Sequence, residues 1–153
     1  MALKKSYFFD SYAVVSLIKG NSNYAKYVQE PVVLTIFNLA EIYWASLKEY
    51  GAGIANQVYD EYKPAVAEID DETLKESIRF RLKNKNKNLS YADCICYVFA
   101  LRNGMIFLTG DKEFEELSEK NIVSKSGAKK IKKFEEEFCG YFEEVYKFFS
   151  KPR

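Results

Sequence analysis

The sequence predicts an α/β fold with three layers, α/β/α, around a central parallel sheet of four to five strands. Short apolar runs rich in β-branched and aromatic residues alternate along the 153 residues with longer segments of helical periodicity. Strands separated by helices pair in parallel through right-handed crossovers, which place helices on both faces of the sheet. We expect a single domain over residues 1–153, with a C-terminal helical extension from about residue 125.

Strands are predicted where an apolar run is short and lies between turn or capping residues. Residues 6–9 (SYFF), 31–34 (PVVL) and 105–108 (MIFL) have this composition. Residues 65–69 have a weaker version of the pattern and make a fourth strand. Residues 121–124 have the weakest version and would be the fifth.

Helices are predicted from the capping residues that bound each segment of helical periodicity. Asp10, Thr35 and Ser90 are residue types that favour the N-cap position, and Gly20 and Gly104 are expected to end helices. The predicted helices cover residues 11–19, 22–30, 36–49, 54–62, 71–83, 91–103 and 112–117. Another is expected from residue 127 onward, with an apolar face for core packing or for a partner, formed by Phe134, Phe138, Phe142, Val145 and Phe149.

The composition limits the chemistry available to this chain. It has no histidine, which excludes Ser-His and Cys-His catalysis and a histidine general base. Its three cysteines, Cys94, Cys96 and Cys139, do not have the spacing of a zinc site, and we expect reduced, mostly buried thiols. An enzyme of this composition works with carboxylates, hydroxyls, amines and a hard metal ion.

Two features favour a soluble, cytoplasmic protein. The sequence contains no apolar run of about 18 residues, the length needed to span a membrane. Asp10 interrupts the apolar stretch near the N-terminus, which is atypical of a signal peptide.

Four acidic residues occupy positions where a catalytic site is expected. Asp10 and Asp111 each follow a predicted strand, and sites in parallel sheets lie beyond the carboxyl ends of the strands. Glu41 and Asp93 are lone charges in apolar helical segments; the segment around Glu41, residues 36–47, is apolar nearly all round and should be buried. A lone buried carboxylate is costly unless it is paired or ligated.

Each acid also has a purely structural interpretation. Asp10 and Asp111 can cap the helices that follow them, and Asp93 stands three residues after Ser90, the spacing of a capping box. A distant lysine or arginine could pair with Glu41 or with Asp93. Capping and metal binding are compatible, because a helix N-terminus fixes the position of the carboxylate.

If the four acids converge, protons or a cation must relieve their repulsion. Mg²⁺ and Mn²⁺ are hard ions that bind carboxylates and water. Such an ion lowers the pKa of bound water and stabilises charge on a phosphoryl oxygen, which suits phosphodiester hydrolysis.

Basic residues are concentrated just before Asp93. Residues 79–87 contain five bases and no acid, and residues 83–88 (KNKNKN) have the composition of an exposed loop. A second basic cluster lies at residues 120–133. Clusters of this kind form either solvated surface or a contact surface for a phosphate backbone.

The ordered set of motifs resembles the PIN-domain ribonucleases, particularly the small VapC-like toxins of toxin–antitoxin pairs. The similarity covers about residues 5–124, in the segments YFFDSYAVVSLI, TIFNLAEIYWASL, LSYADCICYVFALRNG and MIFLTGDKEF. Any one of these segments is weak evidence for the family, whereas the four in this order are strong evidence. Tyr12 departs from the usual pattern, in which a smaller or polar residue is commoner at this position. The stretch from residue 125 extends beyond the point where members of this family usually end.

The resemblance implies a metal-dependent endoribonuclease that uses Mg²⁺ or Mn²⁺. By this resemblance, the catalytic and metal-binding residues are Asp10, Glu41, Asp93 and Asp111. Ser11 and Thr109 would support the site through their hydroxyl groups, and Phe114 would be a packing residue.

The implied partners are an RNA substrate and an antitoxin protein. We expect Lys83, Lys85 and Lys87 to contact the RNA backbone without reading bases. The aromatic content and the C-terminal extension, with the family precedent, favour a homodimer.

Two other functions fit part of the sequence. A non-catalytic RNA- or protein-binding domain could use the same fold, although four acids would repel phosphate without a metal. A phosphoaspartate enzyme or receiver domain also has an aspartate after its first strand, but the second acid of those sites is missing after Asp10.

Overall fold

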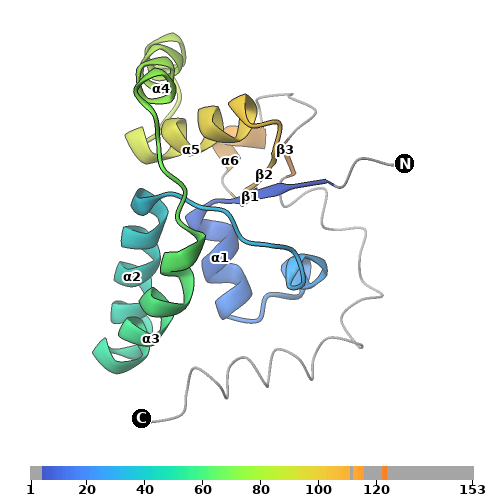
Figure 1. The fold of residues 1–153 in the computed structure, drawn as a ribbon, viewed down its shortest axis with the longest axis vertical. Coiled ribbons are helices and arrows are strands. Elements are labelled where there is room, and N and C mark those ends of the chain that lie inside the picture. Colours follow the sequence, from blue (N-terminus) through green and yellow to red (C-terminus); the bar gives the residue numbers. More distant parts are fainter. Residues whose placement is uncertain (1–4, 111, 116–121, 124–153) are drawn as a thin grey trace.

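A central parallel sheet confirms the predicted fold class (Figure 1). The computed structural model describes residues 5–110, 112–115 and 122–123. In these residues the strands β1 (Tyr7–Phe9), β2 (Ile106–Leu108) and β3 (Ile122–Val123) pair in parallel in the order β1-β2-β3. The segments at 6–9, 105–108 and 121–124 were therefore correctly predicted as strands.

The other two predicted strands, at 31–34 and 65–69, are reduced to a single parallel bridge between Leu34 and Val66. They still extend the sheet beyond β1, because the Phe9 N–H donates to the Val33 carbonyl at 2.9 Å. The described part of the chain thus has three strands, where four to five were predicted. The first segment is short because Pro31 has no N–H to donate and Thr35 already caps the next helix.

Six α-helices of the described residues match predicted helices, with ends that differ by a few residues. They are α1 (Ser11–Ile18), α2 (Ile36–Tyr50), α3 (Ala52–Tyr62), α4 (Asp71–Lys83), α5 (Tyr91–Arg102) and α6 (Lys112–Glu115). The helix predicted at 22–30 is a 3-10 helix, η1 (Ser22–Tyr27), and a second one, η2 (Lys63–Ala65), precedes the Val66 bridge. The extension predicted from residue 125 lies outside the described residues. None of the described helices has the length and apolar character needed to cross a membrane.

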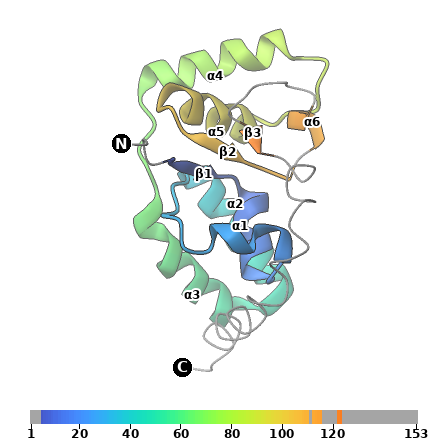
Figure 2. The ribbon, with the colours of Figure 1, turned by 90° about the vertical axis from the view of Figure 1, so that its right-hand side faces the viewer.

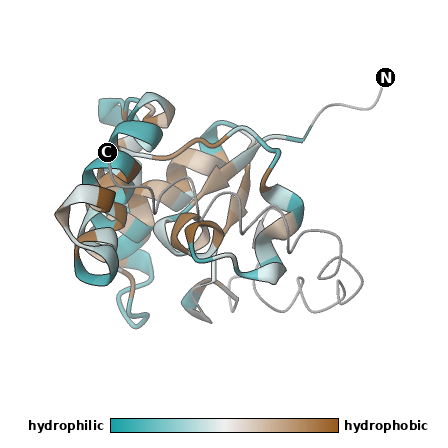
Figure 3. Cartoon of the chain, turned by 90° about the horizontal axis from the view of Figure 1, so that it is seen from below, coloured by the Kyte–Doolittle hydropathy of each residue, from teal (hydrophilic) through white to brown (hydrophobic). Residues whose placement is uncertain are grey.

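Alternate strand residues face two separate cores, which produces the three layers (Figure 2). Phe9 and Leu108 pack with α1, α2 and α3 on one face of the sheet. Phe8 and Phe107 pack with α5 on the other face, where their rings stack at 5.8 Å between centroids. Figure 3 shows the brown, hydrophobic strands between helices that carry both teal and brown residues.

The expectation that residues 36–47 are buried nearly all round is wrong. Helix α2 packs on α1 and α3 through one face, which carries Leu39 and Ile42. On its other face are Ile36, Phe37, Trp44 and Leu47, of which Trp44 is 64% exposed. We call these four residues the α2 apolar stripe; apolar composition alone did not determine burial here.

Candidate active site

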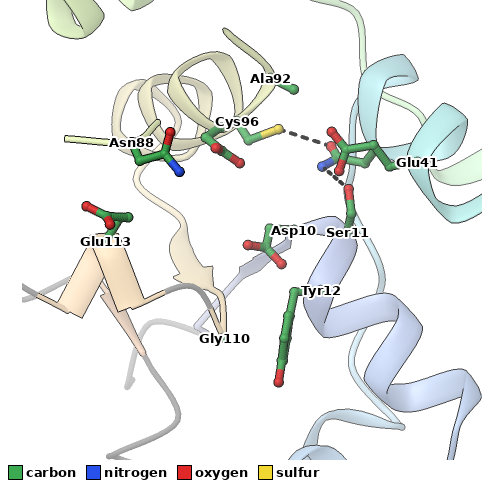
Figure 4. Close-up of a pocket in the computed structure, with 11 residues that line it drawn as sticks. Asp10, Ser11, Tyr12, Glu41, Asn88, Ala92, Cys96, Gly110 and Glu113 are labelled. Carbon is green, nitrogen blue, oxygen red and sulfur yellow. Dashed lines mark hydrogen bonds between the residues drawn. The ribbon is translucent and has the colours of Figure 1, made fainter. Parts of the chain in front are cut away.

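Three of the four predicted acids, Asp10, Glu41 and Asp93, line one pocket of about 530 Å³. The pocket lies at the carboxyl end of β1, which is hydrogen-bonded to Val33 on one side and pairs with β2 on the other. This is the position expected for a site in a parallel α/β sheet. Asp111 lies outside the described residues, although Gly110 and Glu113 on either side of it line the same pocket (Figure 4).

Asp10 connects the end of β1 to the start of α1. Its Oδ1 accepts a hydrogen bond from the Ala13 N–H at 3.0 Å, and its Oδ2 accepts one from the Thr109 hydroxyl. Burial raises the pKa of Asp10 to about 7; the bonds from Thr109 and Ala13 oppose this shift and the charge of Asp93 adds to it. Asp10 is therefore an N-cap and a pocket residue at once.

Asp93 likewise caps its helix and lines the pocket. It forms the predicted capping box: the Ser90 N–H donates to its Oδ2 at 2.8 Å, and its own N–H donates to the Ser90 hydroxyl at 3.1 Å. Its negative charge raises the pKa of both Asp10 and Glu41.

Glu41 reaches the pocket from an exposed position of α2. Burial of the carboxylate raises its pKa, a hydrogen bond from Ser11 lowers it, and the charge of Asp93 raises it. The ion pairs among residues 5–110, 112–115 and 122–123 join Lys19 to Glu49, Lys75 to Glu72 and Arg102 to Glu76, so none in this part of the chain neutralises Glu41.

A family model described as "PIN domain" matches residues 7–120. The chain belongs to the PIN domain family. Two solved structures are similar to it. A toxin–antitoxin complex from Klebsiella pneumoniae has a TM-score of 0.64 at 15% identity, covering 78% of this chain and 98% of that one. The crystal structure of PAE2754 from Pyrobaculum aerophilum has a TM-score of 0.59 at 18% identity, covering 82% and 93%. Comparison with curated proteins finds no match.

The two predicted supporting hydroxyls of this PIN domain lie against the acids. Thr109, which is fully buried, donates to Asp10. Ser11 lines the pocket with Glu41, and a hydrogen bond from Ser11 lowers the pKa of Glu41. Phe114 is fully buried and packs against Phe107 at 4.9 Å between ring centroids.

Several pocket residues of the PIN domain were not predicted from the sequence. They are Tyr12, Asn38, Asn88, Ala92, Cys96, Gly110 and Glu113. Cys96 lies one helical turn after Asp93, so its spacing could have placed it on the same face of α5. Asn38 stands three residues after Thr35, and it completes a capping box with that residue.

The basic residues predicted to contact RNA lie between α4 and the pocket. Lys83 is the last residue of α4, and Lys83 and Lys85 are exposed while Lys87 is half-buried. The next residue, Asn88, lines the pocket, so this segment leads to the pocket rim.

The donor set suits a hard divalent cation. Asp10, Glu41 and Asp93 present carboxylate oxygens, and the charge of Asp93 raises the pKa of both others, a repulsion that a cation relieves. In the described part of the chain, no three acidic or thiol side chains meet closely enough to bind one ion directly. Mg²⁺ fits such a spacing because it usually retains several waters and binds only one or two carboxylates.

Proposed function

We propose that this PIN domain is a metal-dependent endoribonuclease, the toxin of a toxin–antitoxin pair, which hydrolyses RNA phosphodiester bonds with Mg²⁺ or Mn²⁺. The observation that carries the proposal is the pocket that Asp10, Glu41 and Asp93 share at the carboxyl end of the sheet. With no histidine in the chain, these carboxylates are the candidate ligands for a hard metal ion in the pocket.

The residues that would hold the ion are Asp10, Glu41 and Asp93, with Asp111. When bound, a divalent cation supplies an activated water and stabilises negative charge on the phosphoryl group. Asp10 is held by Thr109 and by the first turn of α1, so its carboxylate is fixed before an ion arrives. With a pKa of about 7, Asp10 exchanges its proton for a cation readily at neutral pH.

The proposed substrate is an RNA chain held by its phosphates. Neighbouring phosphates must approach a pocket of carboxylates, which requires positive charge at the rim. Lys83, Lys85 and Lys87 supply that charge next to Asn88. Lysine contacts to phosphate position a strand but do not select its bases.

The proposed protein partner is an antitoxin that covers the α2 apolar stripe, and the proposed location is the cytoplasm. The similarity to a structure that is a toxin–antitoxin complex supports such a partner. Exposed apolar surface of this kind is typical of protein contacts. A homodimer formed through the C-terminal extension is a separate prediction.

The test is cleavage of end-labelled RNA by the purified protein with Mg²⁺, with Mn²⁺ and with EDTA. We expect cleavage with either metal and none with EDTA. Asp93→Asn should abolish cleavage and leave the thermal unfolding temperature similar or higher, because repulsion is relieved. Asp60→Asn, the same change at an exposed position of α3, should retain activity.

Full activity of Asp93→Asn would contradict the proposed site. Binding of RNA by the wild-type protein without cleavage in either metal would instead favour a non-catalytic RNA-binding domain.

A further inference from the structure

Asn38 is a buried polar residue that joins three helices at the pocket. It lies in the first turn of α2 and is 2% exposed. Its Oδ1 accepts hydrogen bonds from the Thr35 N–H and hydroxyl, both at 2.8 Å, and from the Cys96 thiol of α5 at 3.2 Å. Its Nδ2 donates to the Ser11 hydroxyl of α1 at 3.1 Å.

The donors around Asn38 fix the direction of its amide. A backbone N–H can only donate, so the oxygen of the amide must face Thr35. The amide nitrogen therefore faces Ser11, and it can also only donate. The Cys96 thiol keeps its proton for this contact because burial raises its pKa to about 12.

This geometry determines the direction of the Ser11 hydroxyl. The Ser11 oxygen accepts a hydrogen bond from Asn38, so its single proton is left to donate elsewhere. Glu41 lines the same pocket as Ser11, and a hydrogen bond from Ser11 to its carboxylate lowers the pKa of Glu41. Figure 4 marks with dashed lines the hydrogen bond that Ser11 accepts from Asn38 and the one that the Cys96 thiol donates from α5.

We propose that Asn38 is a positioning residue: it orients the Ser11 hydroxyl toward Glu41 and thereby holds the Glu41 carboxylate toward the pocket in one conformation. The inference rests on the proposed function, in which Glu41 is a metal ligand. Hydrogen bonds that orient metal ligands are worth about 10–100-fold in metal affinity.

Asn38→Asp is the sharpest test, because it retains the shape and the acceptor oxygens while removing the donor to Ser11. The Thr35 cap and the Cys96 contact can persist, and the Ser11 proton turns from Glu41 to the new carboxylate. Simple electrostatics predicts tighter cation binding from the added negative charge. The positioning role predicts weaker cation binding, so the two explanations predict changes in affinity of opposite sign.

The measurement is calorimetric titration with Mn²⁺ alone, combined with thermal unfolding in EDTA. We expect Asn38→Asp and Ser11→Ala each to weaken Mn²⁺ binding about tenfold or more, and Ser11→Thr to restore most of it. Adding Asn38→Asp to Ser11→Ala should weaken binding no further, because both act through one hydroxyl. Ser16→Ala, the same change at the other serine of α1, which is buried, should bind as the wild type does.

Unchanged or tighter Mn²⁺ binding by a folded Asn38→Asp protein would overturn the proposal, as would additive effects in the double variant. If the wild type itself neither binds Mn²⁺ nor cleaves RNA, the proposed function fails separately. Crystal structures of metal-free wild type and Asn38→Asp then decide the positioning role. The Ser11 hydroxyl should be bonded to Glu41 in the wild type and turned to residue 38 in Asn38→Asp. A Ser11–Glu41 contact that is the same in both structures would refute the positioning role.

Discussion

The ring of Tyr12 occupies the space that a side chain at Gly110 would need. A Cβ atom at Gly110 would lie 2.1 Å from Cε1 of Tyr12, far inside van der Waals contact. Tyr12 and Gly110 both line the pocket. The large side chain after the Asp10-Ser11 pair is thus accommodated by glycine after β2.

Gly110→Ala should destabilise the protein by about 1–3 kcal/mol, because the added methyl group overpacks the contact with Tyr12. Urea unfolding of the single variant and of Gly110→Ala with Tyr12→Ser measures this. The double variant should recover most of the stability. Gly53→Ala is the matched control: it lies in α3 with nothing within 4 Å, and it should be neutral or stabilising by up to about 1 kcal/mol.

Asp10 should make the metal-free protein less stable as the pH rises. Its pKa is raised from 3.8 to about 7 in the fold, so the folded protein holds a proton that the unfolded chain releases. The stabilising effect of the neutral form is complete below about pH 4 and is lost as the pH rises to about 7. Asn keeps the N-cap acceptor without the charge.

We therefore predict that Asp10→Asn raises the free energy of unfolding by an amount that grows with pH. Urea unfolding in EDTA should show similar free energies for variant and wild type near pH 4, and an advantage of a few kcal/mol for the variant above pH 7. A constant difference across this range would contradict the raised pKa.

Local capping made much of the fold and part of the site predictable. Asp10, Thr35 and Ser90 all cap helices as expected, because each bond joins residues only three positions apart in the sequence. The carboxylates of Asp10 and Asp93 also line the pocket. The sequence singled them out because Asp10 follows a strand and Asp93 is a lone charge in an apolar segment.

Long-range contacts explain what the sequence did not reveal. Asn38 meets Ser11 across 27 residues and Cys96 across 58, and no local pattern encodes either contact. The exposure of Trp44 depends on which face of α2 packs against α3, which the apolar composition of the helix does not specify.

Replacing Lys83, Lys85 and Lys87 by alanine should weaken RNA binding equally for all sequences. On single strands the plot of log affinity against log salt should become shallower by about 0.7 for each lysine–phosphate pair removed, or roughly 2 for all three. Turnover of saturating substrate should change little. A triple alanine variant at Lys26, Lys63 and Lys75 removes the same charge elsewhere and should keep the wild-type slope. Equal slopes for the two triple variants would show that the lysines at residues 83–87 are solvated surface and do not contact RNA.

Trp44 is the single tryptophan of the chain, and it is exposed on the α2 apolar stripe beside Lys48, whose Nζ lies 5.2 Å from the ring centroid. Its fluorescence therefore reports on that surface alone. In the isolated protein we expect a red emission maximum and strong quenching by acrylamide, and on binding of an antitoxin a blue shift with protection from quenching. The antitoxin used should contain no tryptophan.

Two exposed leucines give a matched pair for this test. Leu47→Glu places a charge within the stripe and should abolish the blue shift and the binding, because the carboxylate would lose its hydration in an apolar contact. Leu82→Glu makes the same change on α4, at a leucine that is 70% exposed, and should leave both unchanged. A blue shift that depends only on the concentration of the protein itself, with light scattering above 17.8 kDa, would assign the stripe to a second copy of the chain instead of an antitoxin.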